Sequence, residues 1–235
     1  MSLLTTSGLK RNFGGLTAVS NVDFALTQGE VRALIGPNGA GKSTFIGLLC
    51  GRLPPSAGRV EFDGRDVTAL PAHKRIGLGM AYTFQITSIF GGLSAHENVA
   101  LAARRALGRG EVADKVGAAL AQVGLSDRAG DVAGDLSYGH QRLLEIAMGL
   151  VQSPRLLILD EPTQGLAESE IAAFKALVRN LAGGMTILLV EHNMSVVMET
   201  ADKITVLNFG AVLAEGTPAE IQADKAVQSA YLGGE

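Results

Sequence analysis

The sequence predicts an α/β fold with a buried, mainly parallel sheet at its core. Short apolar runs at 31–35, 156–159 and 186–190 alternate with longer amphipathic stretches. The runs are continuous rather than alternating, as expected for strands that are covered on both faces. Polar residues follow each run, and ligands of open α/β sheets gather at the carboxyl ends of the strands. We therefore expect the three strand ends to meet around one ligand.

A second, smaller sheet is predicted beside this core. Residues 3–9, 22–26 and 60–62 alternate apolar with polar side chains. Such alternation favours antiparallel strands with one covered face. We expect these strands to form an antiparallel side sheet.

The middle of the chain is predicted to be helical. Ser94, followed three residues later by Glu97, forms a capping box, and alanine-rich segments come after it. We therefore predict a single domain with an α/β core at 1–86 and 152–235 and an inserted helical subdomain at 87–151.

Composition limits the classes of protein to consider. A chain of 235 residues can bury a sizeable core, and its net charge of −3 lacks the basic excess of a nucleic-acid binder, so we expect no nucleic-acid partner. Cys50 is the only cysteine, which excludes an internal disulfide and fits a reducing compartment. No apolar run has the length of a membrane span, and the N-terminus lacks the layout of a secretion signal. We expect a cytosolic chain that reaches a membrane only through a partner.

The segment after the first apolar run carries the most specific motif. From Gly36 to Thr44 it fits the phosphate-binding loop pattern, in the strand-to-helix context that the pattern requires. Glycines let backbone N–H groups surround a polyphosphate, and the following helix points its positive end at the same anion. The alternative is a glycine-rich turn before an ordinary helix, which this context disfavours. The predicted nucleotide contacts are Gly36, Pro37, Asn38, Gly39, Ala40, Gly41, Lys42, Ser43 and Thr44.

Three of these side chains have distinct expected roles. Lys42 would reach the β- and γ-phosphates, and Ser43 would offer its hydroxyl to Mg²⁺, which keeps several waters in such sites. Thr44 is expected to be a second phosphate donor.

An acidic pair follows the second apolar run. Asp160 is placed to hold Mg²⁺ directly or through water, and Glu161 is placed to polarise an attacking water. An acidic pair considered alone is more often just the solvent-exposed end of a buried strand than a catalytic pair. The phosphate loop in the same chain favours the functional reading, because the pair supplies the metal and base functions of phosphoryl transfer.

Four other residues are weaker candidates when each is taken alone. His192 follows the last apolar run and could contact a γ-phosphate, and Gln85 lies after a short apolar stretch. Ser137 is a good N-cap, and Gly139 leaves the first helical turn open, so this helix could present N–H groups to an anion. An ordinary capped helix explains the same pattern, and physical reasoning alone does not choose between the two.

Taken together, these motifs resemble the ATP-binding subunit of an ABC transporter, a P-loop NTPase, over essentially the whole chain. The resemblance rests on six features in the order and approximate spacing of that family: Phe13, the phosphate loop, Gln85, the helix start at Leu136–Gln141, the pair Asp160-Glu161, and His192. It implies an ABC ATPase core and two subunits that pair head to tail around two ATP molecules. A single glycine-rich turn or acidic pair does not explain all six.

The resemblance also implies roles for individual residues. Phe13 would stack on adenine, Glu161 would act as the catalytic base, and His192 would sense the γ-phosphate. Gln85 would link Mg²⁺ and the water to the transporter contact. Ser137 and Gly139 would bind the ATP held by the other subunit. The segment 86–98, with the apolar pair Ile89-Phe90, would receive a coupling helix of the membrane subunit.

Two segments depart from the commonest family pattern. The usual Leu-Ser-Gly-Gly-Gln helix start has Tyr138 in place of its first glycine and His140 in place of its glutamine. After the acidic pair, the usual Ser-Ala-Leu-Asp is replaced by a segment from Gln164 to Ala167, so its aspartate is missing. We expect an active ATPase in which the two ATP sites communicate through other contacts.

Some sequence features of the chain resemble those of the ATPases of branched-chain amino acid importers. Tyr138-Gly139, the segment 82–85 and the ending at 230–233 carry this finer resemblance. It implies ATP and Mg²⁺ as ligands, permease subunits and a second ATPase as partners, an indirect link to a solute-binding protein, and a place on the cytoplasmic face of the membrane. The alternatives are an ATPase of a lipid or polysaccharide exporter and a soluble ABC ATPase that acts on nucleic acid. The cargo and the choice between homodimer and heterodimer stay open.

Overall fold

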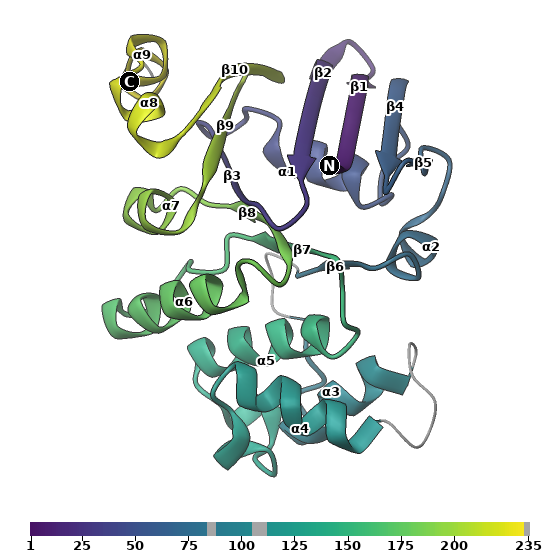
Figure 1. The fold of residues 1–235 in the computed structure, drawn as a ribbon, viewed down its shortest axis with the longest axis vertical. Coiled ribbons are helices and arrows are strands. Elements are labelled where there is room, and N and C mark those ends of the chain that lie inside the picture. Colours follow the sequence, from purple (N-terminus) through teal and green to yellow (C-terminus); the bar gives the residue numbers. More distant parts are fainter. Residues whose placement is uncertain (84–87, 105–111, 233–235) are drawn as a thin grey trace. The chain divides into compact units, whose positions relative to one another are not determined.

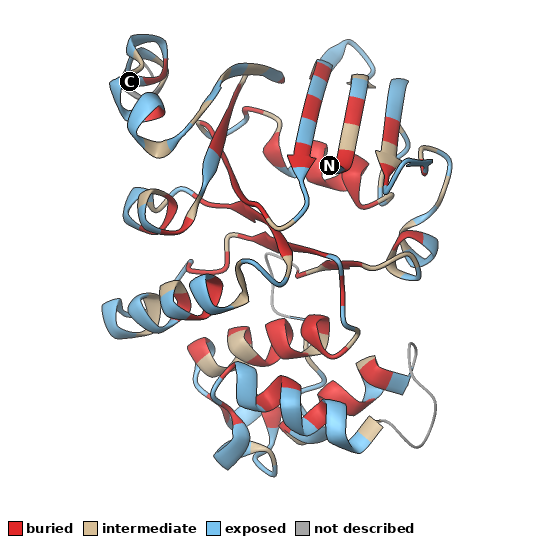
Figure 2. Ribbon diagram, in the orientation of Figure 1, coloured by how far each residue is buried: buried red, intermediate tan, exposed pale blue. Residues whose placement is uncertain are grey.

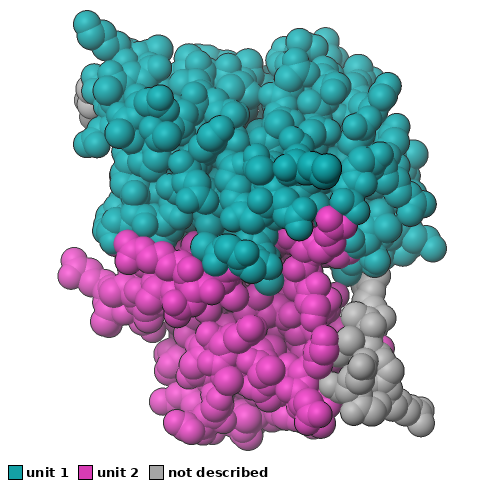
Figure 3. Space-filling model, viewed as in Figure 1, with its two compact units in different colours: residues 1–78, 182–235 teal, residues 79–181 magenta. Residues whose placement is uncertain are grey.

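The computed structural model describes residues 1–83, 88–104 and 112–232 and divides into two compact units. Unit 1 contains residues 1–78 and 182–235, and unit 2 contains residues 79–181 (Figure 3). Figure 1 labels the helices and strands of each unit. The predicted division at 86/87 and 151/152 stays a prediction.

The side sheet of unit 1 is antiparallel, as predicted. Its strand order is β2-β1-β4-β5. Figure 2 shows buried and exposed positions alternating along β2, the pattern of a strand with one covered face. The strands are β1 (Ser2–Phe13), β2 (Leu16–Thr27), β4 (Ala57–Phe62) and β5 (Arg65–Asp66). On the covered face, Phe24 packs edge-to-face on Phe45 with ring centroids 5.5 Å apart.

Unit 1 also holds buried parallel strands, which confirms the predicted core. β3 (Val31–Ile35) pairs in parallel with β8 (Thr186–Val190) and with β9 (Lys203–Asn208). β10 (Ala211–Gly216) adds an antiparallel strand on the far side of β9. Every residue of β3 and β8 is buried. The helices of this unit are α1 (Lys42–Leu49), α2 (Ala72–Ile76), α7 (Met194–Thr200), α8 (Pro218–Ala223) and α9 (Lys225–Leu232).

A buried cation interrupts the apolar run of β3. Arg32 is 1% exposed and forms ion pairs with Glu30 and, at 2.8 Å, with Glu215. Its guanidinium also donates to the Thr205 hydroxyl at 2.8 Å and lies 5.4 Å from the centre of the Phe24 ring. Burial alone would raise the pKa of Glu30, but the hydrogen bonds from Arg32 and Thr27 lower it below its usual value. Arg32 is tolerated in a buried strand because its charge is paired and its N–H groups are bonded.

Unit 2 combines two parallel strands with helices. β6 (Met80–Tyr82) pairs in parallel with β7 (Leu156–Asp160), and β7 is buried along its whole length. The helices are α3 (Ala95–Arg104), α4 (Val112–Gln122), α5 (Tyr138–Leu150) and α6 (Glu168–Leu181), with short 3₁₀ turns at Ser126–Arg128 and Ala133–Asp135. Within the described ranges, no helix combines the length and apolarity needed to cross a membrane.

The predicted capping box at the start of α3 is confirmed. The Glu97 backbone N–H donates to the Ser94 hydroxyl at 3.2 Å, and the Ser94 backbone N–H donates to the Glu97 carboxylate at 2.8 Å. These hydrogen bonds from Ser94 lower the pKa of Glu97. The reciprocal bonds satisfy two backbone donors that a helix start leaves without partners.

Candidate active site

The phosphate loop forms the turn between β3 and α1 in unit 1. Its lysine is almost fully buried at 8% exposed, and Lys42 Nζ donates to the carbonyls of Gly36 at 2.7 Å and Pro37 at 3.1 Å. Asn38 and Gly39 are exposed at the tip of the loop. The ammonium is therefore aimed along the inside of the loop, where the predicted phosphates would lie.

Two of the loop glycines are required by the packing around them. A Cβ on Gly36 would lie 2.2 Å from the Leu207 carbonyl oxygen, and one on Gly41 would lie 2.3 Å from the Ala18 carbonyl oxygen. Both glycines also have positive φ, 151° and 98°. The Gly210 backbone N–H donates to the Ala40 carbonyl at 3.0 Å. Strands β2 and β9 therefore fix the loop from two sides.

The ends of β3 and β8 lie at the same edge, as predicted. Leu34 pairs with Val190 in parallel register, and the Glu191 N–H approaches the Leu34 carbonyl at 3.4 Å. His192 follows and is exposed. That the end of β7 joins these two around one ligand stays a prediction.

A buried carboxylate that the sequence did not single out holds His192 in place. Glu191 is 1% exposed and accepts the backbone N–H groups of His192 at 3.1 Å and Asn193 at 3.2 Å. The Asn193 side chain then caps α7 by accepting from the N–H groups of Ser195 and Val196. The turn that carries His192 is thus fixed by hydrogen bonds on both sides.

The acidic pair lies at the end of β7 in unit 2. Asp160 is 5% exposed, and its Oδ2 accepts a hydrogen bond from the Tyr82 hydroxyl at 2.8 Å. Tyr82 lies on the neighbouring strand β6, where it pairs with Ile158. This hydrogen bond orients Asp160. At the level of the sequence, Tyr82 counted only as part of the segment 82–85 and was assigned no role.

Glu161 has an unusual backbone conformation. Its φ is +49°, in the left-handed region that non-glycine residues seldom adopt. Strained backbone of this kind clusters at functional sites, where the surrounding structure over-determines it. Here the Gln164 N–H donates to the Glu161 carbonyl at 3.2 Å, which closes a tight turn after the strand. The conformation turns the chain sharply at the residue expected to be the base.

The helix start at Ser137 is capped as predicted. The Ser137 hydroxyl accepts the His140 backbone N–H at 3.3 Å. A Cβ on Gly139 would lie 2.2 Å from a carboxylate oxygen of Glu170, and the binding of an anion by this helix start stays a prediction. Glycine at this position makes room for Glu170.

The two departures from the family pattern meet in this unit. The Tyr138 ring lies 3.2 Å from the position that a Cβ on Gly165 would occupy, and the Tyr138 hydroxyl accepts from Arg142 at 2.9 Å. Arg142 is itself buried and paired with Glu145 at 3.3 Å. Glycine at 165, where the usual pattern has alanine, leaves space for the bulky ring.

The position of the missing aspartate lies at the start of α6. The Ala167 backbone N–H, at the start of α6, donates to a carboxylate oxygen of Glu170 at 2.9 Å. An N-cap aspartate at 167 would accept from N–H groups further into the helix, so Glu170 serves a different donor of the same helix start.

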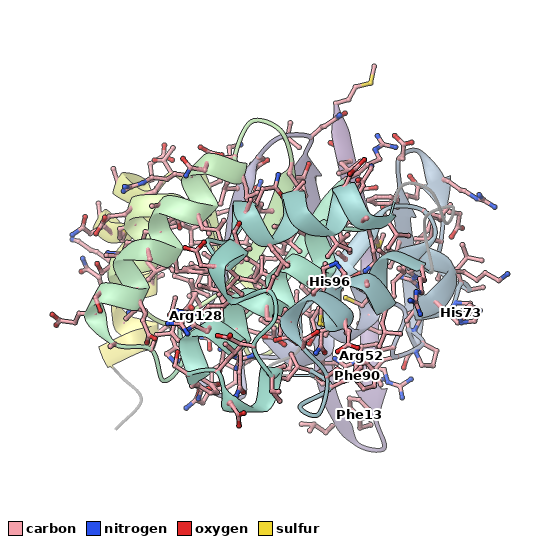
Figure 4. All side chains as sticks on the ribbon, turned by 90° about the horizontal axis from the view of Figure 1, so that it is seen from below. Phe13, Arg52, His73, Phe90, His96 and Arg128 are labelled. Atoms are coloured by element: carbon pink, nitrogen blue, oxygen red, sulfur yellow. The ribbon has the colours of Figure 1, made fainter. Side chains whose placement is uncertain are left out.

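The remaining candidates lie at a strand end and in a loop. Phe13 is 43% exposed at the end of β1, next to the hairpin turn (Figure 4). Phe90 is 56% exposed, Ile89 is half-buried, and the buried Asn98 bonds both the N–H and the carbonyl of Phe90. Gln85 and the start of the predicted docking segment 86–98 lie outside the described residues.

The donor set suits Mg²⁺ bound together with a nucleotide. Among the described residues, no cluster of three or more His, Cys, Asp or Glu side chains could hold a metal unaided. That Ser43 of unit 1 and Asp160 of unit 2 hold one ion stays a prediction. One hydroxyl and one carboxylate would leave most positions to phosphate oxygens and water. Mg²⁺ is usually bound in this manner, with one or two protein ligands.

The α/β fold, the phosphate loop and the acidic strand end define a nucleotide-binding ATPase. The ABC transporter family matches residues 19–164, and a C-terminal family described as branched-chain amino acid ATP-binding cassette transporter matches residues 211–235. The chain belongs to the ABC transporter family, as one of its ATP-hydrolysing subunits.

Individual relatives match the chain from end to end. The high-affinity branched-chain amino acid transport ATP-binding protein BraF of Pseudomonas aeruginosa is 39% identical, with 98% of each chain covered. The lipopolysaccharide export system ATP-binding protein LptB of Haemophilus influenzae is 30% identical, with 99% of this chain and 98% of LptB covered. The crystal structure of the ADP conformation of MJ1267, an ATP-binding cassette of an ABC transporter, has a TM-score of 0.91 at 28% identity, with 99% of each chain covered.

Proposed function

We propose that the chain hydrolyses MgATP to power the import of branched-chain amino acids or of a related small amino acid or amide. The observation that carries this proposal is the 39% identity to BraF over 98% of both chains. The separate match of residues 211–235 to the branched-chain amino acid family supports the same cargo class.

Nucleotide binding is assigned to the phosphate loop and Phe13. The N–H groups at the tip of the loop and the start of α1 would surround the phosphates, with Lys42 on the β- and γ-phosphates and Thr44 as a further donor. Ser43 and Asp160 would hold Mg²⁺, together with Gln85. When bound, Mg²⁺ neutralises charge on the phosphoryl oxygens.

Hydrolysis is assigned to Glu161 and His192. Glu161 orients a water for in-line attack on the γ-phosphorus and accepts its proton, while Lys42 and the loop amides stabilise the charge on the transferring group. His192 donates to the γ-phosphate. The buried Glu191 supports this role because its bonds to the two following N–H groups leave the His192 side chain exposed.

The working unit in this proposal is a pair of ATPase subunits bound to permease subunits. Ser137 and Gly139 of one subunit contact the ATP of the other, so ATP makes contacts with both halves only in the closed pair and favours closure by that difference in affinity. Hydrolysis reopens the pair. The chain would lie on the cytoplasmic face of the membrane, where Phe90 and its neighbours receive the permease and a solute-binding protein delivers the cargo from the other side.

An exporter ATPase is the second candidate, and the 30% identity to LptB is the observation that favours it. Both candidates use the same ATP chemistry, so only the membrane partner separates them.

A pull-down from native membranes tests the assignment. A Glu161→Gln bait, with and without ATP, should retain multi-span permease subunits only with ATP, and Lys42→Ala should retain none. Recovery of an amino-acid permease supports the importer, and recovery of lipopolysaccharide export proteins supports the exporter. Recovery of soluble or nucleic-acid-bound partners alone would overturn both transport readings.

A further inference from the structure

The ring of Phe13 lies against a cation and remains partly exposed. The guanidinium of Arg11 lies 4.6 Å from the centre of the ring, and the Phe13 side chain remains 43% exposed. Residues two apart on a strand project to the same face, so Arg11 and Phe13 share a face of β1. The cation covers one face of the ring, and the 43% exposure of the side chain leaves part of the ring accessible to a ligand.

Arg11 is itself held by the loop that follows α1. Its Nη1 donates to the Pro54 carbonyl at 2.9 Å. Two more hydrogen bonds tie the loop to β1, from the Ser56 N–H to the Lys10 carbonyl at 2.7 Å and from the Asn12 N–H to the Ser56 hydroxyl at 3.1 Å. Within the part of the chain that the structure describes, Arg11 Nε is buried with no hydrogen-bond acceptor. Three hydrogen bonds therefore fasten Arg11 and the end of β1 to this loop.

The irregular strand pairing around Arg11 also supports a role for this residue beside a ligand site. Register shifts flank Arg11 in its pairing with β2, between Leu9 and Arg11 and again between Arg11 and Asn12. Irregularities of this kind re-aim side chains and are over-represented next to active sites.

Both strands of the hairpin are connected to the phosphate loop. The loop that holds Arg11 follows α1, which begins at Lys42. On β2, the Ala18 carbonyl occupies the space beside Gly41 that a Cβ would fill. The aromatic ring and the phosphate-binding backbone are therefore fixed in one unit at a set spacing.

We propose that Arg11 is a positioning residue for the base of the bound nucleotide and acts by holding the Phe13 ring ready to stack. The inference rests on the proposed function, in which Phe13 stacks on adenine. Without Arg11 the ring would lose a cation–π contact and would have to be immobilised when nucleotide binds, and both effects weaken base binding while leaving phosphate binding unchanged.

The test compares a ligand that has a base with one that has none. Affinities for ADP and for inorganic pyrophosphate, both with Mg²⁺, are measured by titration calorimetry on the full chain and on Arg11→Met, Phe13→Ala and the double variant. Arg59→Met is the matched control, because Arg59 lies on β4 of the same sheet, is 60% exposed and pairs only with surface carboxylates among the described residues.

We expect Arg11→Met to weaken ADP binding about two- to tenfold, and Phe13→Ala to weaken it about five- to one-hundred-fold. The double variant should bind ADP no more weakly than Phe13→Ala alone, and pyrophosphate binding should stay unchanged in all of them. If Arg11→Met unfolds the chain, Arg11→Gln takes its place, since glutamine keeps a polar side chain but has no charge to place over the ring.

Each other result contradicts a different part of the proposal. Equal losses for ADP and pyrophosphate in Arg11→Met, or a loss equal to that of Arg59→Met, would show a structural or long-range charge effect. An additive loss in the double variant would show that Arg11 acts independently of Phe13. Unchanged ADP binding in Phe13→Ala would overturn the adenine contact itself, while the ATPase and transport assignments, tested by the pull-down, would stand.

Discussion

Lys42 is the residue on which nucleotide affinity should depend most. Lys42→Ala removes a charge-assisted contact to the phosphates, worth about 1.5–3 kcal/mol, and should weaken ATP binding roughly ten- to one-hundred-fold. Binding is measured by calorimetry and turnover by phosphate release. Thermal unfolding of the variant controls for the loss of the two bonds from Lys42 to the loop carbonyls. Normal hydrolysis by a folded variant would remove the phosphate-loop assignment.

Glu161 separates binding from chemistry. Glu161→Gln keeps the shape of the side chain but cannot accept a proton, so ATP should still bind while hydrolysis falls about 10²- to 10⁴-fold. Single-turnover phosphate release measures the chemical step directly. Asp127→Asn is a suitable control because Asp127 is an exposed acid in a 3₁₀ turn of the same unit. Unchanged turnover in Glu161→Gln would exclude it as the base.

At this scale the motif residues could be predicted from sequence, whereas their supporting contacts could not. The phosphate loop and the acidic pair are local patterns whose chemistry follows from residue type and spacing. Tyr82 on Asp160 and Glu191 behind His192 depend on strand register and burial, which no local pattern specifies. The contact of Arg11 with Phe13 lies beyond the strand predicted at 3–9, and only the structure shows it.

Between elements, the Tyr138 ring and Gly165 form a testable pair. Gly165 and Gly124 have similar positive φ, 78° and 74°, so alanine costs the backbone about 1–2 kcal/mol at either position. Only Gly165 has a ring within 4 Å of its Cβ position. Gly165→Ala should therefore destabilise the chain more than Gly124→Ala in urea unfolding, and adding Tyr138→Ala to each should remove the difference. Equal losses in the native background would contradict the pairing.

The buried pair in β3 predicts both stability and its pH dependence. Arg32→Met leaves Glu30 buried without its cation and should lower the free energy of unfolding by about 3–5 kcal/mol. The exposed Arg59→Met should change it by less than about 0.5 kcal/mol. Urea unfolding measures both variants.

The sign of the pH effect follows from Glu30. Its pKa is lowered in the folded state, so its contribution is fully present above the usual value of 4.5 and is lost as the pH falls through the lower folded value. The native chain should therefore lose stability on acidification below pH 4.5 more steeply than Arg32→Met. Parallel stability curves would contradict a lowered Glu30 pKa.

The elements themselves were largely predictable. Continuous apolar runs and alternating ones produced the parallel and antiparallel strands where expected, because burial on two faces or one determines each pattern. Arg32 in β3 and Glu170 beside Gly139 were not predictable, since each is accommodated by partners far away in the sequence.

For the whole molecule, the proposal predicts an ATP-dependent pair. Glu161→Gln should shift from one to two subunits, alone or with a second ATPase, when ATP is added, and Ser137→Ala should weaken this shift. Light scattering after size-exclusion chromatography measures the mass. The measurement is repeated with any second ATPase that is recovered with the chain. If the mass does not increase with ATP in either sample, the two subunits do not share ATP sites.

The central claim is tested most directly by transport. The complex recovered with this chain is placed in lipid vesicles with its solute-binding protein, and uptake of labelled leucine is measured with ATP on the side of the ATPase. The account predicts leucine accumulation that requires ATP and disappears when the chain carries Glu161→Gln. ATP hydrolysis without uptake of leucine or any related amino acid or amide would contradict the importer assignment.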